Sequence, residues 1–138
     1  MKKQNKQVKQ AKQATKIKKP QTLESLSILG DTYSVYPLTE ENLEKYLPED
    51  SSAFEIHKSA LGLCNNNRGV IMIRPGLNSS RYVSTMLHEV LHSIVSQMCV
   101  DLGKNEELVV TQVAQGLAAV LSSNPRLVSL IQEAGKDG

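Results

Sequence analysis

The sequence predicts an α+β fold, in which a small mixed or antiparallel sheet packs on a helix carrying the pentapeptide His-Glu-x-x-His (HExxH) and on a second, glutamate-bearing helix. Three observations support this prediction. Residues 32–36 alternate in the strand period, two apolar runs flank an asparagine-rich turn in residues 60–74, and residues 80–121 follow the helical period. With 138 residues and 40% hydrophobic content, the chain can form one compact domain.

The charges divide the chain into a predicted disordered tail, residues 1–20, and a folded domain, residues 21–138. Residues 1–19 contain eight lysines and no acid, so the rest of the chain has 8 of the 16 basic residues against 14 acidic ones. A solvated tail is the favoured interpretation. The alternative is that residues 2–19 contact DNA or another polyanion, because clustered lysines release counterions on binding.

Composition also argues against several classes of protein. No apolar run reaches the length of a membrane span and no leader peptide is recognisable, so we expect a cytoplasmic protein with no membrane partner. The two cysteines, Cys64 and Cys99, do not form a C-x-x-C pair and are expected to be free thiols. Tryptophan is absent, which argues against a stacking platform for single-stranded nucleic acid.

In the first half of the domain, the sequence predicts a strand followed by a short helix. Residues 32–36 form the strand, which Pro37 ends. Thr39 is a suitable N-cap for a helix that ends at Pro48. Residues 54–57 are predicted to be a further short strand or an extended loop.

A β-hairpin follows, with residues 60–64 and 70–74 as its strands. The intervening turn at residues 65–69 consists of three asparagines, an arginine and a glycine, and both asparagine and glycine tolerate positive φ. We expect residues 70–73 to present an open edge that could hold an extended peptide by main-chain pairing.

Helices fill the second half of the domain. The first is predicted over residues 80–101 with a stop at Gly103. The second begins after Asn105 as N-cap and extends to about residue 121. The last covers residues 125–133, with proline at its first position.

The motif His88-Glu89-Val90-Leu91-His92 lies within the first of these helices. Residues i and i+4 share a helix face, so the imidazoles of His88 and His92 can bind one metal ion, and Glu89 can accept a proton from water on that metal. The alternative is a purely structural role, in which both histidines form local hydrogen bonds at the border of the core and bind no metal. An apolar face is predicted beside them, formed by Val83, Leu87, Val90, Leu91, Ile94, Met98 and Leu102.

A hydrolytic zinc site requires a third protein ligand. The metzincin pattern is excluded, because Val95 and Met98 stand where its glycine and third histidine belong. Glu107 is the preferred ligand, since it shares a face with the apolar residues of the second helix. Glu106 and the upstream His57 remain alternatives, and acids in a first helical turn are also favoured by the helix dipole without any metal.

The motif, the preceding strand and the following E-E-x-V-V-x-x-V-A-x-G-L helix with Asn-Pro resemble small gluzincin-type metallopeptidases of the ImmA/IrrE kind, including short phage-borne relatives. The resemblance covers residues 60–131 and implies a minimal zincin fold. It also implies Zn²⁺ bound by His88, His92 and Glu107, with Glu89 as the catalytic residue. The asparagine that often follows the ligand glutamate in larger relatives is Thr111 here, and no helix-turn-helix domain is recognisable.

The sequence therefore predicts a zinc-dependent peptidase that acts on a protein or peptide, with Glu89 as general base. The donor that would stabilise the oxyanion stays open among Tyr82, Arg81 and His57. The alternative function is a non-hydrolytic, metal-bound regulatory module that the basic tail recruits to DNA or to a protein partner.

Overall fold

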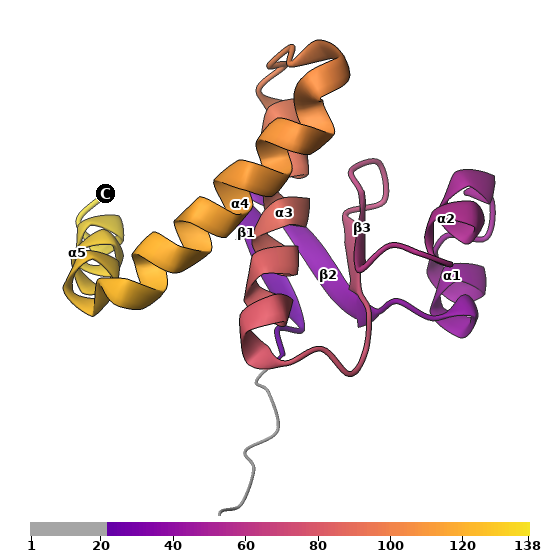
Figure 1. Cartoon of the computed structure of the whole chain (residues 1–138), viewed down its shortest axis with the longest axis horizontal. Helices are drawn as coiled ribbons and strands as arrows, with labels where there is room; N and C mark the ends of the chain where they lie inside the picture. Colours follow the sequence, from indigo (N-terminus) through magenta and orange to yellow (C-terminus); the bar gives the residue numbers. More distant parts are fainter. Residues whose placement is uncertain (1–21) are drawn as a thin grey trace, which may run out of the picture.

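A computed structural model describes residues 22–138 and has the α+β architecture expected from the sequence (Figure 1). The tail predicted at residues 1–20 lies outside the described residues. Within them, four strands form one mixed sheet in the order β1-β2-β4-β3. The strands are β1 (Ser25–Ile28), β2 (Asp31–Pro37), β3 (Gly62–Asn65) and β4 (Val70–Ile73).

Strands β2, β3 and β4 match the sequence predictions, whereas β1 was not predicted. β1 pairs antiparallel with β2 through a tight turn in which Leu29 and Gly30 both have positive φ. Only four residues long, β1 offers too little alternation to be recognised from its pattern alone.

Strand β4 occupies the middle of the sheet, which corrects the prediction of an open edge at residues 70–73. It pairs parallel with β2 on one side and antiparallel with β3 on the other. All four of its side chains are buried, since the run Val-Ile-Met-Ile is covered on both faces. The edge strands are β1 and β3 instead.

One face of the sheet carries two short helices, α1 (Glu40–Tyr46) and α2 (Ser51–Ile56). Thr39 caps α1 as predicted, by accepting a hydrogen bond from the Asn42 amide. α2 corrects the strand or loop expected at residues 54–57: the Asp50 carboxylate accepts a hydrogen bond from the Ala53 amide and starts a helix there. Leu43, Val70 and Met72 contribute to the core on this side.

The opposite face is covered by α3 (Ser79–Gln97), the helix that carries the HExxH motif. Ile71 and Ile73 of β4 pack there with Tyr82 and Met86 of α3. α3 ends four residues earlier than predicted, because Cys99 adopts a left-handed conformation with φ of 53° and turns the chain before Gly103.

The apolar face predicted for α3 is wrong at both ends. Val83 and Met98 are exposed, and the buried side of the helix instead consists of Tyr82, Thr85, Met86, Glu89 and Ser93. Three of these are polar or charged. Val90 and Ile94 of the predicted face do pack against the core, so hydrophobic periodicity located the middle of the buried side but not its ends or its polar members.

The chain then passes through a 3-10 helix, η1 (Gly103–Asn105), into α4 (Glu106–Ser123) and α5 (Pro125–Lys136). α4 crosses α3, and Figure 1 shows its second half continuing beyond the sheet to α5, which contacts α4 and lies away from the sheet. α5 extends three residues beyond its predicted end. Among the described residues, every helix is too short or too polar to cross a lipid bilayer.

Candidate metal centre

The two histidines of the motif lie one turn apart in the middle of α3, beside the buried side of the helix. Asn78 starts this helix by accepting a hydrogen bond from the Arg81 amide. The side chains of His88 and His92 keep about one fifth of their surface exposed, 19% and 22% respectively. Their rings meet edge to face, with centroids 4.7 Å apart.

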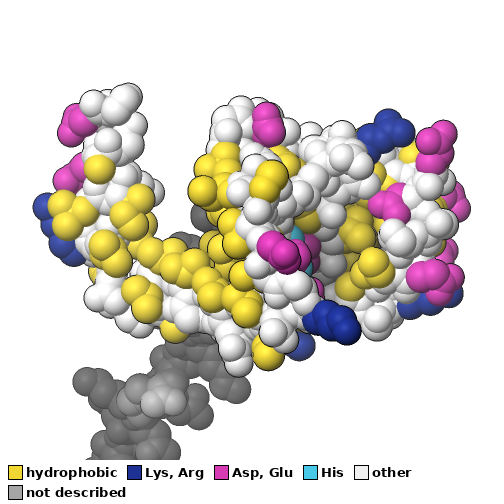
Figure 2. All heavy atoms as spheres, turned by 90° about the horizontal axis from the view of Figure 1, so that it is seen from above, with side chains coloured by type: hydrophobic (Ala, Val, Ile, Leu, Met, Phe, Trp, Pro, Cys, Tyr) yellow, Lys and Arg dark blue, Asp and Glu magenta, His cyan; other side chains and the backbone are white. Residues whose placement is uncertain are grey.

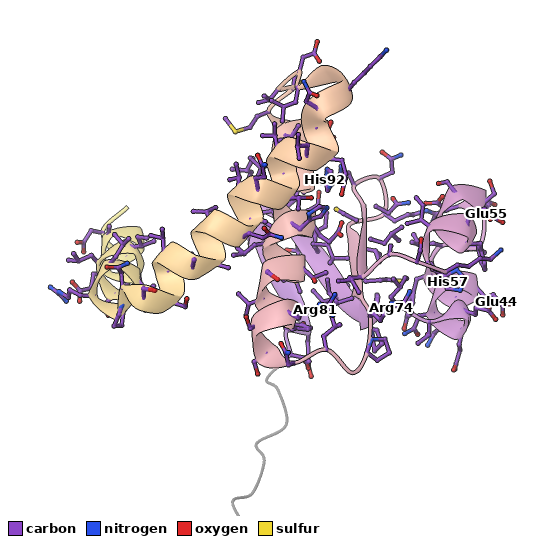
Figure 3. The ribbon with its side chains drawn as sticks, in the orientation of Figure 1. Glu44, Glu55, His57, Arg74, Arg81 and His92 are labelled. Carbon is purple, nitrogen blue, oxygen red and sulfur yellow. The ribbon has the colours of Figure 1, made fainter. Side chains whose placement is uncertain are left out.

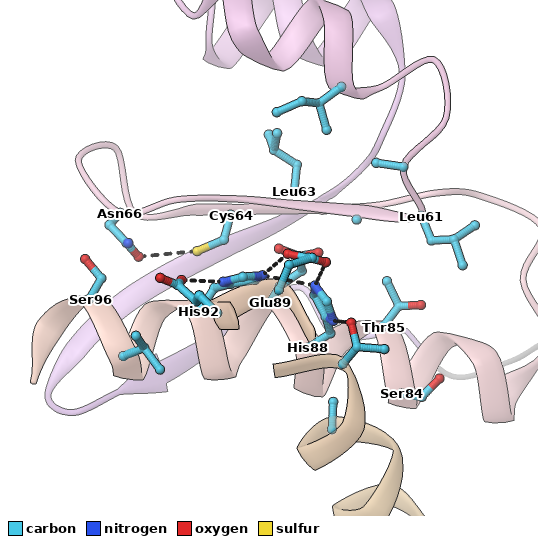
Figure 4. A pocket seen from close by; sticks show the side chains of 18 of the residues that line it. Leu61, Leu63, Cys64, Asn66, Ser84, Thr85, His88, Glu89, His92 and Ser96 are labelled. Atoms are coloured by element: carbon cyan, nitrogen blue, oxygen red, sulfur yellow. Dashed lines mark hydrogen bonds and ion pairs between the residues drawn. The ribbon is translucent and has the colours of Figure 1, made fainter. Parts of the chain in front are cut away.

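Three side chains from two helices converge at one point (Figure 4). The Nε2 atoms of His88 and His92 lie 3.0 Å apart. The carboxylate of Glu107, from the first turn of α4, places Oε1 3.0 Å from Nε2 of His88 and Oε2 2.9 Å from Nε2 of His92. Glu107 thus meets His92 and His88 from 15 and 19 residues further along the chain.

This group has the composition and size to hold a metal ion. One donor atom from each residue lies within 4.8 Å of the other two. Glu107 contacts His88 through Oε1 and His92 through Oε2, so a single ion at this point would be within reach of all three side chains. Three protein ligands leave a fourth position free.

The outer nitrogens of both imidazoles also face oxygens of α4. Nδ1 of His92 lies 2.9 Å from Oε1 of Glu106, and Nδ1 of His88 lies 3.4 Å from Oγ1 of Thr111. Partners of this kind fix the orientation and the tautomer of a metal-binding histidine. Glu106, an alternative ligand in the sequence analysis, thus contacts the side of His92 that faces away from the convergence point.

Glu89 is almost completely buried between α3 and strand β3. Only 6% of its surface is exposed, and burial raises the pKa of its carboxyl group from 4.5 to about 7, with nearby His92 opposing the shift. Burial also lowers the pKa of His88, against the opposing effect of Glu107. The site therefore combines a buried acid with an imidazole, that of His88, whose charged form is disfavoured by burial.

Gly62 makes the close approach of β3 to Glu89 possible. A Cβ atom on Gly62 would lie 2.7 Å from Oε1 of Glu89 and 2.9 Å from Cγ2 of Thr85, both closer than real Cβ contacts. The β3 register places Gly62 and Cys64 on the same face as Ile71 and Ile73, toward α3. No side chain other than hydrogen fits at position 62 without displacing Glu89.

An open hollow of about 1110 Å³ contains the site, with β3 along one side (Figure 4). His88, Glu89, His92 and Glu107 all line it. Cys64 also lines it, and burial together with the charge of Glu89 raises the pKa of its thiol to about 12, so that it stays protonated and unreactive. Both cysteines are free thiols, as expected.

The residues that the sequence analysis considered as a further ligand or as an oxyanion donor lie outside the cluster of His88, His92 and Glu107. His57 ends α2, its Nδ1 2.6 Å from the Phe54 carbonyl oxygen, and Figure 3 shows it on the far side of β3 from His92. It therefore takes no part in this cluster. The Tyr82 hydroxyl accepts a hydrogen bond from the Leu23 amide within the core, whereas Arg81 lines the hollow.

Sequence reasoning missed the contributions of Gly62 and Thr111. Thr111 follows Glu107 by one helical turn, so the i, i+4 relation was available as a signal. Gly62 gave no such signal, because its importance depends on a helix that lies across from it.

Comparison with models of known protein families, with curated proteins and with solved structures gives no match for this chain.

Proposed function

We propose that this chain is a zinc-dependent metallopeptidase that resembles the small gluzincins of the ImmA/IrrE kind. The observation that carries the proposal is the convergence of His88, His92 and Glu107 at the rim of an open hollow, next to a buried glutamate. Two imidazoles and one carboxylate form a donor set of catalytic zinc sites, which keep the fourth position for water or substrate.

Each side chain of the site has a role in this chemistry. Zinc, when bound, lowers the pKa of its water and polarises the scissile carbonyl group. Glu89 accepts the proton of that water and returns it to the leaving amine. A cation held by these residues would favour the ionised carboxylate of Glu89, so that Glu89 could act as a base at neutral pH.

The substrate that fits this hollow is an extended peptide. Strand β3 is at the edge of the sheet and runs along the part of α3 that carries the motif. Its main-chain groups can pair with a peptide laid beside it, which would place a scissile bond next to the metal site. Arg81, on the wall of the hollow, is one candidate donor to the oxyanion.

The deciding experiment compares the zinc-loaded wild-type protein with Glu89→Gln. Both should bind one zinc ion per chain in elemental analysis. Only the wild type should cleave an unstructured peptide library analysed by mass spectrometry, and a matched substitution of an exposed glutamate, Glu55→Gln, should leave cleavage unchanged.

Two results would contradict the proposal. Cleavage by Glu89→Gln at the wild-type rate would exclude Glu89 as the base. A zinc-loaded wild type that cleaves nothing, but whose salt-sensitive DNA binding disappears when residues 1–19 are deleted, would support the non-hydrolytic module recruited by the basic tail.

A further inference from the structure

The second half of α4 together with α5 forms a projecting arm, residues 113–138, and most of the large apolar side chains of this arm are exposed. None of the α5 side chains is buried, and the buried residues of α4 end at Ala114. Among the described elements, α5 contacts mainly α4. Figures 1 and 2 both show α5 standing away from the sheet and its covering helices.

The exposed apolar residues of the arm follow the helical period on both helices. Each keeps between 37% and 57% of its surface exposed: Val113, Leu117, Val120, Leu127, Leu130 and Ile131. Figure 2 shows hydrophobic side chains running without interruption along α4 and onto α5. They border the gap that separates α5 from the rest of the molecule, which is distinct from the hollow at the metal site. Contiguous apolar surface of this kind usually marks an interaction site.

The apolar part of the arm is nearly free of charge, and the other charged residues of the arm, Glu133, Lys136 and Asp137, follow it toward residue 138. Between Leu108 and Gln132 the one charged residue is Arg126, and its guanidinium group pairs with the carboxylate of Glu133 at 3.2 Å. A partner that binds here therefore has to be apolar and neutral at the contact. Nucleic acid and anionic lipid do not satisfy this requirement, because both bind through basic groups.

We propose that the arm is a dimerisation element, which packs in a two-fold arrangement against the arm of a second copy of this chain. In such an arrangement the same surface is used by both copies, so it must be complementary to itself. The arm meets this condition, since each copy presents a projecting amphipathic helix, α5, and an apolar strip on α4 against which α5 of the other copy can pack.

The arm offers exposed apolar surface on both of its helices. Six large apolar side chains are exposed, three on α4 and three on α5, and their burial would favour association. α5 itself is 12 residues long, a length at which an isolated helix is marginal in water and depends on packing. Contact with a second arm supplies that packing to both copies at once.

The test is the mass of the full chain in solution, measured by sedimentation and light scattering from micromolar to submillimolar concentration. The wild type should approach twice the chain mass of 15.2 kDa. Leu127→Glu combined with Ile131→Glu should weaken dimerisation by at least about a hundredfold, because two charges would be buried at the contact. Gln112→Glu with Gln132→Glu, which adds the same charge at exposed polar positions, should leave dimerisation unchanged.

Hydrogen exchange provides a second measurement that does not depend on a variant. Amides of α5 in the wild type should become more protected as the concentration rises, while circular dichroism confirms that the variants remain folded. A wild type that stays at 15.2 kDa at every concentration would overturn the proposal. So would a dimer that Leu127→Glu/Ile131→Glu leaves intact, or a monomer whose arm is protected until residues 1–21 are deleted.

Discussion

Glu106 and Glu107 are neighbours in the sequence, yet they reach opposite nitrogens of the same imidazole. Oε1 of Glu106 lies 2.9 Å from Nδ1 of His92, and Oε2 of Glu107 lies 2.9 Å from Nε2. Successive residues of a helix point about 100° apart, so one helical step is enough to separate the two sides of the ring. The two acids consequently have different roles in the proposed site.

This difference predicts different losses of zinc affinity. Glu106→Gln should weaken binding by about 10–100-fold, the usual effect of removing a partner that orients a ligand. Glu107→Gln should weaken it further, because a negatively charged ligand is lost. Competition with a chelating dye would measure both affinities, and an equal or larger loss in Glu106→Gln would identify Glu106 as the ligand.

The buried carboxyl group of Glu89 makes the stability of the metal-free protein depend on pH. Its pKa is about 7 in the folded chain and 4.5 when solvated, so the folded state binds the proton more tightly. The stability contributed by the protonated form is present below pH 4.5 and is lost as the pH rises through about 7.

Glu89→Gln should therefore be more stable than the metal-free wild type above pH 7, and the two should converge near pH 4.5. Glutamine retains the shape of the protonated acid and cannot ionise, while His88 and its lowered pKa are common to both proteins. Urea unfolding with a chelator present measures the difference between the free energies of unfolding. If the free energies of unfolding of the two proteins differed by the same amount from pH 4.5 to above pH 7, a raised pKa for Glu89 would be excluded.

At the scale of elements, the site depends on how closely β3 approaches α3. Gly62→Ala should destabilise the fold by about 1–3 kcal/mol, as overpacking commonly does, because Glu89 and Thr85 must move away from the added methyl group. Denaturant unfolding would show this as a lower midpoint. If Gly62→Ala left the stability unchanged, β3 and α3 would have to lie further apart than they do in this structure.

Gly116→Ala is the matched control. Gly116 lies within α4, and nothing is within 4 Å of the position that its Cβ would occupy. The same methyl group should stabilise the chain there by about 0.4–1 kcal/mol, since alanine loses less backbone freedom in a helix than glycine does. Opposite signs at the two positions would separate packing at Gly62 from a general effect of the substitution.

For the whole molecule, a metal at this site would join α3, which covers the sheet, to α4, which begins the projecting arm. A ligand bound by the folded state alone stabilises it by about 2.7 kcal/mol at a free concentration 100 times the dissociation constant. Removal of zinc with a chelator should therefore lower the melting temperature, as measured by calorimetry.

His88→Ala should lose this dependence on zinc, since it removes one of the converging nitrogens. His57→Ala is the control, because His57 lies on the other side of β3 and should leave the zinc-dependent shift intact. Identical melting temperatures with zinc and with chelator in the wild type would argue against tight metal binding.

The sequence alone predicted the α+β class, three of the four described strands and the course of the three long helices. It could do so because turn residues, caps and periodicity are local: Thr39 caps α1, and the asparagine-rich turn joins β3 to β4. Where the local signal was weak, prediction failed. Residues 54–57 were expected to form a short strand or an extended loop, although Asp50 caps a helix there.

Spacing within the motif determined that His88 and His92 share one face of a helix, because the helical repeat is a property of the backbone. The tertiary structure decided everything that depends on a second element: the central place of β4, the edge position of β3, the polar buried side of α3, and the separate contacts of Glu106 and Glu107. The physical reason is that a sequence pattern describes one element at a time. Burial, pKa and convergence depend on distances between atoms that are far apart in the chain.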